Sequence, residues 1–471
     1  MASHSASPGA SHSASPGASP KTLETRIEEA GGPVALLRGS NIGPYVFPVI
    51  PPEFTNWRDE MRAWKESCAL LEQSYHMTEL HLRGPGVIPF LSELATNRFD
   101  PYPVKRAKQL VLAGHDGYFV ADGILFHEEE EFFRLVGAPF ASDWVQFNAE
   151  NTDHDIEVKR DDNYVVRVGP RDVFRIQIQG PQAFPLMREV ADGSLPDIKF
   201  FDIGEFRIAG HTVRALRHGM AGELGYEIYG PWDVQQAVRE ALEKTGEKHG
   251  LRKVGALAYS TTGTQSGWMP MPLPAIYHSA EMKPYRKWLK GFFLEILGSL
   301  GGSLVSDDIV DYYVDPVELG YKQLIDFNHD FIGREALREK VDNQRRSKVS
   351  FAWNSDDVMA IIRSSLAPDG TPGKYIAQPN PMYATFESDA VMKNGEVVGI
   401  SQWSCHTPNA DTFMSLGVVN VELAEPGTDV TLLWGEPDSK RRTVEKHEVR
   451  EIRAKVAPAP FFEKVIKSGK Q

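Results

Sequence analysis

Cysteine is scarce in this chain of 471 residues, which has two, Cys68 and Cys405. Two thiols are too few for a disulfide framework or for a zinc site built on cysteine. We therefore expect a reducing, cytoplasmic setting in which both thiols are buried as small apolar side chains.

Long apolar runs are missing as well. No stretch approaches the roughly 18 to 20 residues needed to cross a bilayer. The N-terminus has no basic segment followed by an apolar one, so secretion is not expected. A membrane is therefore not an expected partner.

Positive charge is in deficit, because 51 Lys and Arg against 64 Asp and Glu leave a net charge of −13. Nucleic-acid binding calls for clustered excess Lys and Arg, so that partner is not expected either. The Rossmann, P-loop, zinc-protease and serine-hydrolase motifs are absent. No cluster of metal ligands is recognisable, and we expect a reaction that needs no metal.

Apolar and aromatic residues are plentiful, with 41% hydrophobic residues, nine Trp and 24 Phe. This composition and length suit sizeable cores in about three domains. The exception is the N-terminus, where SHSASPGA at 3–10 recurs at 11–18. Such a Ser/Pro/Gly/Ala repeat has nothing to bury, which predicts a disordered tail over 1–20.

The periodicity of the remaining chain predicts an α+β protein. Apolar side chains at helical spacing predict a helix over 53–73, on which Trp57, Met61, Trp64, Cys68 and Leu71 share one face. Apolar runs between 110 and 136 predict consecutive antiparallel strands, with the acidic run at 128–131 solvated in a turn. Helices are expected over 181–192 and 232–248, and short C-terminal strands broken by Gly, Pro and Asn predict a β-barrel or jelly roll.

The segment GELGYEIYGP at 222–231 is the first that indicates chemistry. A glycine-rich turn leads into a short strand on which Glu227 faces away from Tyr226 and Ile228. A buried carboxylate there can accept two parallel hydrogen bonds from an amidine-like edge, such as that of a pterin or guanine, or from an Arg of the chain itself. The segment alone favours the internal Arg pair and leaves the ligand open.

Three segments in the same order resemble the aminomethyltransferase family, the T-protein of the glycine cleavage system and its relatives. They are GELGYEIYGP, DFIGREAL at 330–337 and SLGVVNVELAEPGTDVTLLWG at 415–435. The resemblance covers about residues 25–460 and implies a three-domain folate-binding α+β fold. It implies a body of two intertwined subdomains over 21–345 and a β-barrel or jelly-roll domain over 346–471.

Departures from the glycine enzymes indicate the branch. Those enzymes have two adjacent acidic residues where this chain has Ala121-Asp122, and Ala-Arg-Asp where it has Ala258-Tyr259-Ser260. The chain instead resembles the tetrahydrofolate-dependent aryl methyl ether O-demethylases, in the segments IGPYVFP (42–48), EFTNWR (53–58), YHM (75–77), RHGMAG (217–222), VGALAY (254–259) and QSGWMPMPLPAIY (265–277). This resemblance implies a methyltransferase that moves the methyl group of an aromatic methyl ether to N5 of tetrahydrofolate, giving 5-methyltetrahydrofolate and a phenol.

The resemblance also implies residue roles. Tyr259 stands where the demethylases have their catalytic tyrosine, and its ordinary pKa near 10 suits a phenol leaving group; the alternative is that it packs on the pterin. Tetrahydrofolate would be bound by Gln177, Glu227, Trp268, Phe200, Val136 and Gly137. The aromatic substrate would be bound by His76, Tyr45, Phe47, Ala138 and Leu297.

Three of these positions concern specificity. Vanillate-type demethylases have Arg at Ala138, Tyr at Phe47 and a small polar residue near Leu297. These apolar replacements would each leave a buried polar group of a vanillate-like ligand unpaired, at about 1 to 3 kcal/mol. We therefore predict a bulkier or less polar methoxybenzoate, syringate-like or dicamba-like, with dicamba favoured because all three changes remove polarity.

Several alternatives stay open. The donor could be vanillate or 3-O-methylgallate, or a sulfonium or N-methyl compound, and a non-catalytic folate-binding protein is a further hypothesis. The retained Tyr259 and the absence of a Cys-containing motif argue against the last. The sequence leaves the oligomeric state unknown.

Overall fold

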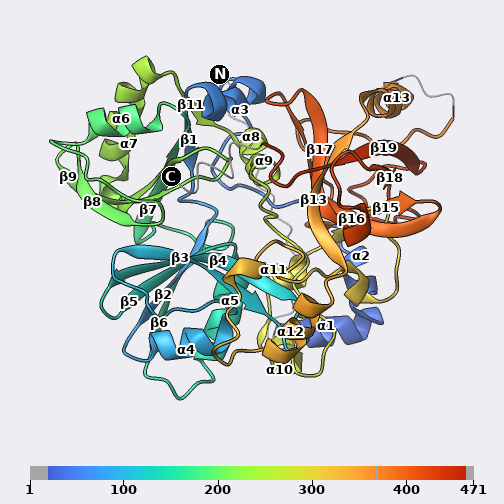
Figure 1. Ribbon diagram of the computed structural model, residues 1–471, viewed down its shortest axis with the longest axis horizontal. Helices are drawn as coiled ribbons and strands as arrows, with labels where there is room; N and C mark the ends of the chain where they lie inside the picture. Colours follow the sequence, from blue (N-terminus) through green and yellow to red (C-terminus); the bar gives the residue numbers. More distant parts are fainter. Residues whose placement is uncertain (1–19, 367–369, 463–471) are drawn as a thin grey trace.

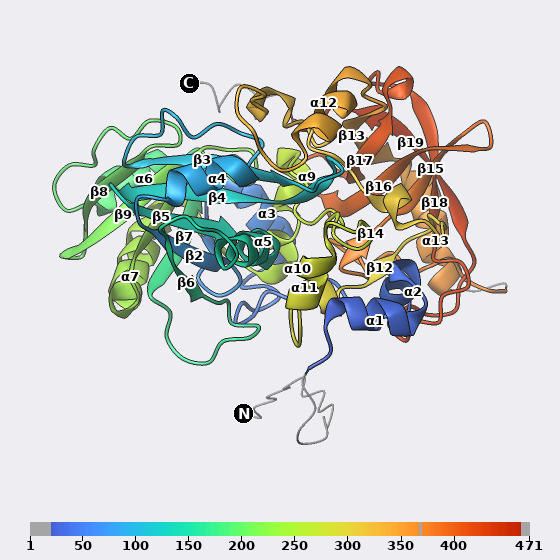
Figure 2. The same ribbon diagram turned by 90° about the horizontal axis from the view of Figure 1, so that it is seen from below.

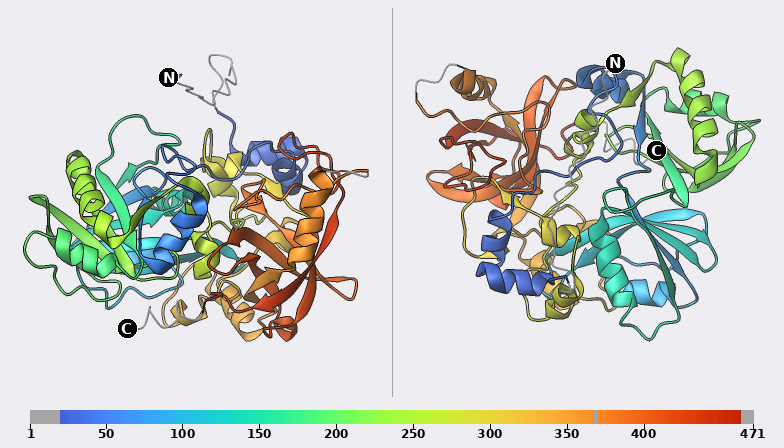
Figure 3. Two further views of the ribbon diagram at one scale, coloured as in Figure 1. Left: turned by 90° about the horizontal axis from the view of Figure 1, so that it is seen from above. Right: turned by 180° about the vertical axis from the view of Figure 1, so that it is seen from behind.

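The computed structural model describes residues 20–366 and 370–462. The tail expected over 1–20 lies outside the described residues, except for Pro20. Two sheets and a closed barrel lie around a common centre (Figure 1). The view from behind separates the same three parts (Figure 3). This arrangement confirms the expected α+β architecture.

The first sheet has six strands in the order β11-β1-β7-β10-β9-β8, in which only β1 and β11 pair in parallel. Helices α6 (Ala183–Val190) and α7 (Gln235–Gly246) cover one face of it, as expected for 181–192 and 232–248. The strands are β1 (Cys68–Glu72), β7 (Val173–Gln179), β8 (Ile203–Ile208), β9 (His211–His218), β10 (Gly225–Pro231) and β11 (Leu251–Val254).

Alternation along these strands determines what points inward. On β7, Phe174, Ile176 and Ile178 pack against α6 and α7. The intervening side chains, Arg175 and Gln177 among them, therefore point to the opposite face.

The second sheet is antiparallel, in the order β3-β4-β5-β2-β6. Its consecutive strands β3 to β5 confirm the prediction for 110–136. Helices α4 (Val87–Leu94) and α5 (Pro139–Ala149) pack against it in the largest core. The strands are β2 (Thr78–Arg83), β3 (Arg106–Ala113), β4 (Phe119–Glu129), β5 (Phe132–Gly137) and β6 (Glu157–Asp161).

The two sheets face each other. Phe126 and Val136 of the second sheet share a small core with Leu216 and Tyr229 of the first. Side chains from both inner faces are thereby brought to one place between the sheets.

The C-terminal part forms a closed barrel in the order β13-β17-β16-β15-β18-β19, which confirms the predicted barrel. Helix α13 (Ser355–Leu366) packs against its core through Val358 and Ile361. The strands are β13 (Arg346–Trp353), β15 (Asp389–Lys393), β16 (Glu396–Thr407), β17 (Thr412–Asn420), β18 (Asp429–Trp434) and β19 (Arg450–Ala457).

Short elements connect the three parts. In Figure 2, α10 and α11 lie between α5 and the paired strands β12 and β14. The remaining elements are α1 (Leu23–Ala30), α2 (Pro33–Arg38), α3 (Trp57–Glu66), α8 (Ala256–Tyr259), α9 (Thr262–Ser266), α10 (Lys283–Trp288), α11 (Leu294–Leu297), α12 (Arg334–Asp342), β12 (Leu300–Gly301), β14 (Phe386–Glu387), and the 3₁₀ turns η1 (Trp232–Val234), η2 (Glu247–His249), η3 (Ile309–Tyr312), η4 (Lys322–Leu324) and η5 (Val421–Leu423).

Two predictions from the sequence were wrong, one in each sheet. The helix expected over 53–73 ends at Glu66, and residues 68–72 form β1, which is buried on both faces between β7 and β11. Glu128, expected in a solvated turn, is buried, because Arg134 and Arg214 compensate its charge at 3.1 and 2.7 Å. Pairing with distant residues decided both outcomes.

Both thiols are buried, as expected, and burial raises the pKa of each to about 12. Within residues 20–366 and 370–462, no helix is long and apolar enough to cross a bilayer. The same residues include no group of three or more His, Cys, Asp or Glu side chains placed to hold a metal ion.

Candidate active site

Two cavities adjoin at the centre of the molecule. The larger, about 320 Å³, lies between the inner faces of the two sheets, and the smaller, about 90 Å³, extends toward the barrel. We call them the inter-sheet cavity and the small chamber. They share a wall formed by Met77, Ala138, Met220, Trp268 and Pro270.

The inter-sheet cavity collects most of the residues predicted to bind the cofactor. It is lined by Glu227, Trp268, Phe200, Val136 and Gly137. Gln177 lies outside its lining; the side chain is fully buried, and its Nε2 donates to the His218 carbonyl at 3.3 Å.

The carboxylate of Glu227 is bound by two side chains of the first sheet. Arg175 Nη1 donates to Oε1 at 2.5 Å, and His218 Nε2 is hydrogen-bonded to Oε2 at 2.7 Å. Burial by itself raises the pKa of Glu227, but Arg175 and His218 outweigh it, and the pKa lies below its ordinary value. The internal Arg pair considered for this motif is therefore present, and it fixes a carboxylate that also lines the cavity.

Gln73 is a cavity residue that sequence reasoning missed. It follows β1 directly and is 2% exposed, and its Oε1 has no hydrogen-bond partner among the described residues. A buried acceptor without a partner costs stability unless a ligand supplies the donor. Gln73 lies at the end of the helix predicted over 53–73, and no local sequence pattern marked it as a cavity residue.

Trp268 is fixed at the shared wall by its indole nitrogen. Nε1 donates to Asp122 Oδ2 at 3.1 Å, and the same oxygen accepts from Gln109 Nε2 at 2.9 Å and from the Tyr321 hydroxyl. Burial raises the pKa of Asp122 despite these donors. The indole face is thus held in one orientation beside both cavities.

The small chamber is built around Tyr259, which ends the short helix α8. Its hydroxyl is hydrogen-bonded to His76 Nε2 at 3.0 Å, and its ring lies 4.8 Å from that of Phe47, centre to centre. The Tyr45 hydroxyl donates to the His76 carbonyl at 2.7 Å. Burial raises the pKa of Tyr259 above its ordinary value, so the hydroxyl stays protonated and can donate a hydrogen bond.

Of the predicted substrate residues, His76, Tyr45, Phe47 and Ala138 line the small chamber. Leu297 does not; it lines a separate cavity of about 290 Å³ that also contacts Tyr45.

The C-terminal part completes the small chamber through three residues that sequence reasoning did not name. Asn380, Met382 and Trp403 line it, and Trp403 Nε1 donates to the Ser260 carbonyl at 2.9 Å. No local motif marks these three residues as neighbours of Tyr259.

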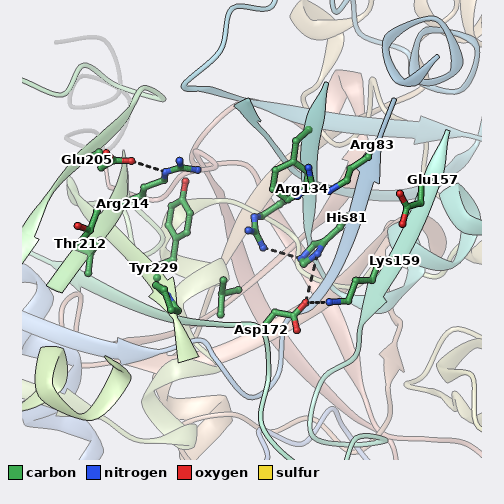
Figure 4. A pocket seen from close by; sticks show the side chains of 15 residues that line it. His81, Arg83, Arg134, Glu157, Lys159, Asp172, Glu205, Thr212, Arg214 and Tyr229 are labelled. Carbon is green, nitrogen blue, oxygen red and sulfur yellow. Dashed lines mark hydrogen bonds and ion pairs between the residues drawn. The ribbon is translucent and has the colours of Figure 1, made fainter. Parts of the chain in front are cut away.

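A more open cavity of about 560 Å³ lies elsewhere between the sheets (Figure 4). Several of its charged side chains bind one another: Asp172 accepts from Lys159 at 2.5 Å, and Arg214 donates to Glu205 at 3.1 Å. His81 is hydrogen-bonded to Arg134 at 2.9 Å. These pairs connect strands, and the two adjoining cavities remain the candidate site.

Comparison with known proteins agrees with this architecture. The family model "GCVT N-terminal domain" matches residues 39–270. Syringate O-demethylase from Sphingobium sp. is 39% identical over 444 residues, which cover 94% of this chain and 96% of the relative. Sesamin methylene transferase from Sinomonas sp. is 27% identical over 439 residues, which cover 88% of this chain and 91% of the relative.

A solved structure shows the same fold. The glycine cleavage system aminomethyltransferase T from Bartonella henselae superimposes with a TM-score of 0.59 at 17% identity, covering 92% of this chain and 98% of its own. Together with the extended identity to syringate O-demethylase, this shows that the chain belongs to the aminomethyltransferase family, in the group that includes that demethylase.

Proposed function

We propose that this protein transfers the methyl group of a methoxybenzoate, syringate-like or dicamba-like, to N5 of tetrahydrofolate and releases 5-methyltetrahydrofolate and a phenol. The observation that carries the proposal is the shared wall between two cavities, with the Tyr259 hydroxyl 3.7 Å from the sulfur of Met220 in that wall. Kinship with syringate O-demethylase supports an aromatic methyl ether as donor, and membership of the family supports tetrahydrofolate as acceptor.

The inter-sheet cavity suits a pterin. The pterin edge carries N–H donors, and the cavity offers the Glu227 carboxylate and the unpartnered Oε1 of Gln73 as acceptors. Phe200 and the fixed indole of Trp268 supply flat apolar surfaces for stacking. Bound tetrahydrofolate would supply the amine nitrogen that accepts the methyl group.

The small chamber suits the aromatic donor. Among the described residues, neither Lys nor Arg lines it, and Phe47, Met271, Met382 and Trp403 make it apolar. With the methoxy group at the shared wall, Tyr259 would donate a hydrogen bond to the ether oxygen as the C–O bond breaks. His76 and Phe47 orient the Tyr259 ring. Such assistance contributes about 10² to 10⁴ in rate.

The proposal is tested by incubating the full-length protein with tetrahydrofolate and, separately, syringate, dicamba, vanillate and 3-O-methylgallate. Formation of 5-methyltetrahydrofolate and the matching phenol is measured. We expect syringate or dicamba to react faster than vanillate, because the apolar lining of the small chamber favours an added methoxy group or ring chlorines, which vanillate lacks. No product from any donor would contradict the function, and fastest turnover of vanillate would contradict the proposed specificity.

The Tyr259→Phe variant distinguishes an ether donor from a sulfonium or N-methyl donor. We expect kcat with the best methoxybenzoate to fall about 10²- to 10⁴-fold while the Kd for tetrahydrofolate is unchanged. An unaffected kcat with the methoxybenzoate would contradict this role of Tyr259. An onium leaving group needs no proton, so turnover of a sulfonium or N-methyl donor at the same rate by both proteins, with no turnover of the ethers, would favour that alternative. Tyr375→Phe, at an exposed position, is the matched control and should behave as the wild type.

A further inference from the structure

The segment 44–50 covers one side of the small chamber. Its Tyr45 and Phe47 side chains line the chamber, whereas those of Val46 and Val49 are exposed. One stretch of chain thus has the chamber on one side and solvent on the other.

This segment also contacts the groups proposed to react. The ring centre of Phe47 lies 4.9 Å from that of His76 and 4.8 Å from that of Tyr259. The Tyr45 hydroxyl donates to the His76 carbonyl at 2.7 Å. A movement of the segment would therefore uncover Tyr259.

The backbone of the segment is held at its ends. Among the described residues, no backbone N–H or C=O group of 44–50 makes a hydrogen bond to the protein. Just before it, the Gly43 carbonyl accepts from Thr385 Oγ1 at 3.2 Å, and just after it, the Pro51 carbonyl accepts from Ala256 N at 2.9 Å. Segments with a solvated backbone between fixed ends open at low free-energy cost.

Val49 makes the observed conformation less favourable still. Its φ is 70°, in the left-handed region that a β-branched residue disfavours. Its side chain is exposed, so little packing offsets this strain. The segment is therefore poised to change conformation.

A second cavity on the other side of Tyr45 offers room for such a change. The cavity of about 290 Å³ that Leu297 lines, here called the side cavity, has Tyr45 in its wall as the small chamber does. Val165, Val166 and Phe292 line it and are exposed. Exposed apolar side chains around a cavity are typical of a surface that receives an apolar ligand.

The small chamber needs an entrance of its own. In the proposed reaction tetrahydrofolate fills the inter-sheet cavity, so the shared wall does not admit the aromatic donor. Tyr45 separates the small chamber from the side cavity, and a turn of this side chain would join the two.

We propose that residues 44–50 are a lid, and that the aromatic donor enters the small chamber from the side cavity when the lid turns Tyr45 away from His76. The inference rests on the proposed function for the identity of the donor. Opening breaks the hydrogen bond from Tyr45 to the His76 carbonyl and moves Phe47 off Tyr259. Closure restores both contacts and shields the reacting groups from water.

The test follows the lid directly in the full-length protein. Cys68 and Cys405 are buried, so a thiol reagent should label only an added cysteine. Val46→Cys, labelled with an environment-sensitive fluorophore, is mixed rapidly with syringate and, separately, with dicamba. Tetrahydrofolate is left out so that no methyl group is transferred. We expect a fluorescence change whose rate reaches a plateau as the ligand concentration rises, because lid opening limits entry.

Tyr45→Phe, introduced into the labelled Val46→Cys protein, removes the hydroxyl that ties the lid to His76 and keeps the ring. We expect the plateau rate to rise about fivefold, the effect of losing one hydrogen bond. Val305→Cys, labelled in the same way, is the matched control. Val305 is 68% exposed, as Val46 is, and lines neither cavity, so its label should give no signal.

Three results would overturn the lid. They are a silent label at Val46 while calorimetry shows the ligand bound, an equal signal from Val305, and a rate that has no plateau or a plateau unchanged by Tyr45→Phe.

The two hypotheses fail differently. If the wild type binds neither ligand and turns over no methoxybenzoate, the proposed function fails and the lid fails with it. If the wild type turns over methoxybenzoates while the Val46 label stays silent, only the lid is overturned.

Discussion

At the scale of single residues, the contact between His76 and Tyr259 determines which proton can be donated. A tyrosine hydroxyl carries one hydrogen. If His76 Nε2 carries a proton and donates it to the Tyr259 oxygen, the Tyr259 hydrogen meets only a weak acceptor, Met220 Sδ at 3.7 Å, and can be donated to the departing ether oxygen. This tautomer leaves Nδ1 bare, which suits its buried position without a partner among the described residues. His76 is therefore a positioning residue for Tyr259.

The neutral state of His76 makes stability depend on pH. Burial first, and the charge of Arg171 second, lower its pKa from 6.5 to about 3. Between these values the unfolded chain binds more protons than the folded one, so the contribution of His76 to stability falls as pH falls below 6.5. At pH 5 the loss is about 2 kcal/mol, at 1.36 kcal/mol for each pH unit.

Urea denaturation at pH 7.5 and pH 5 measures this loss. We expect His76→Gln to lose about 2 kcal/mol less between the two values than the wild type. The same pH dependence in both proteins would contradict the assignment. His211→Gln, at the start of β9, is the control for a generic effect of removing a histidine.

At the scale of elements, Arg175 connects three strands of the two sheets. From β7 it donates to Glu79 of β2 at 2.6 Å and to Glu227 of β10 at 2.5 Å, and its guanidinium lies over the Phe126 and Tyr229 rings. The buried arginine thus links the two sheets beside the inter-sheet cavity and fixes the Glu227 carboxylate that lines it.

Removing Arg175 should lower the stability of the fold. Arg175→Met leaves two buried carboxylates less compensated, and we expect a loss of about 3 to 5 kcal/mol of unfolding free energy, measured by urea denaturation. Adding Glu79→Gln removes one of these charges and should recover part of the loss. A loss below about 1 kcal/mol would show that the remaining partners of Glu79 suffice.

The elements also show what the sequence could and could not predict. Strands β3 to β5 and the barrel strands follow from apolar runs separated by Gly, Pro and Asn, which act locally. The change from α3 to β1 after Glu66 does not follow from the local sequence, because pairing with β7 and β11 overrides the helical spacing of Cys68 and Leu71. Tyr259 and Glu227 lie in recognisable motifs, whereas Gln73 and Asn380 reach the cavities through contacts far apart in the sequence.

At the scale of the whole molecule, Arg441 ties the C-terminal part to the segment that carries Tyr45 and Phe47. Its buried guanidinium donates to the Ser40 and Ile42 carbonyls, both at 3.1 Å, and is paired with Glu436 at 3.2 Å. The wall of the small chamber is therefore supported from a distance.

Arg441→Met should loosen that wall. We expect the KM for the methoxybenzoate to rise about tenfold or more, since small displacements of positioning groups have large effects, with little change in the KM for tetrahydrofolate. Because Glu436 would be left buried and unpaired, the double variant with Glu436→Gln controls for lost stability. Equal changes in both KM values would contradict a chamber-specific role.

The shared wall also affects where the methyl group can go. Its side chains are two methionines, an alanine, a proline and an indole whose N–H is already bonded to Asp122. None of them offers a free hydrogen-bonding group to a water molecule. A methyl group crossing there meets the acceptor before it meets solvent, so the proposed reaction should form no methanol, and each donor molecule consumed should yield one methylated acceptor.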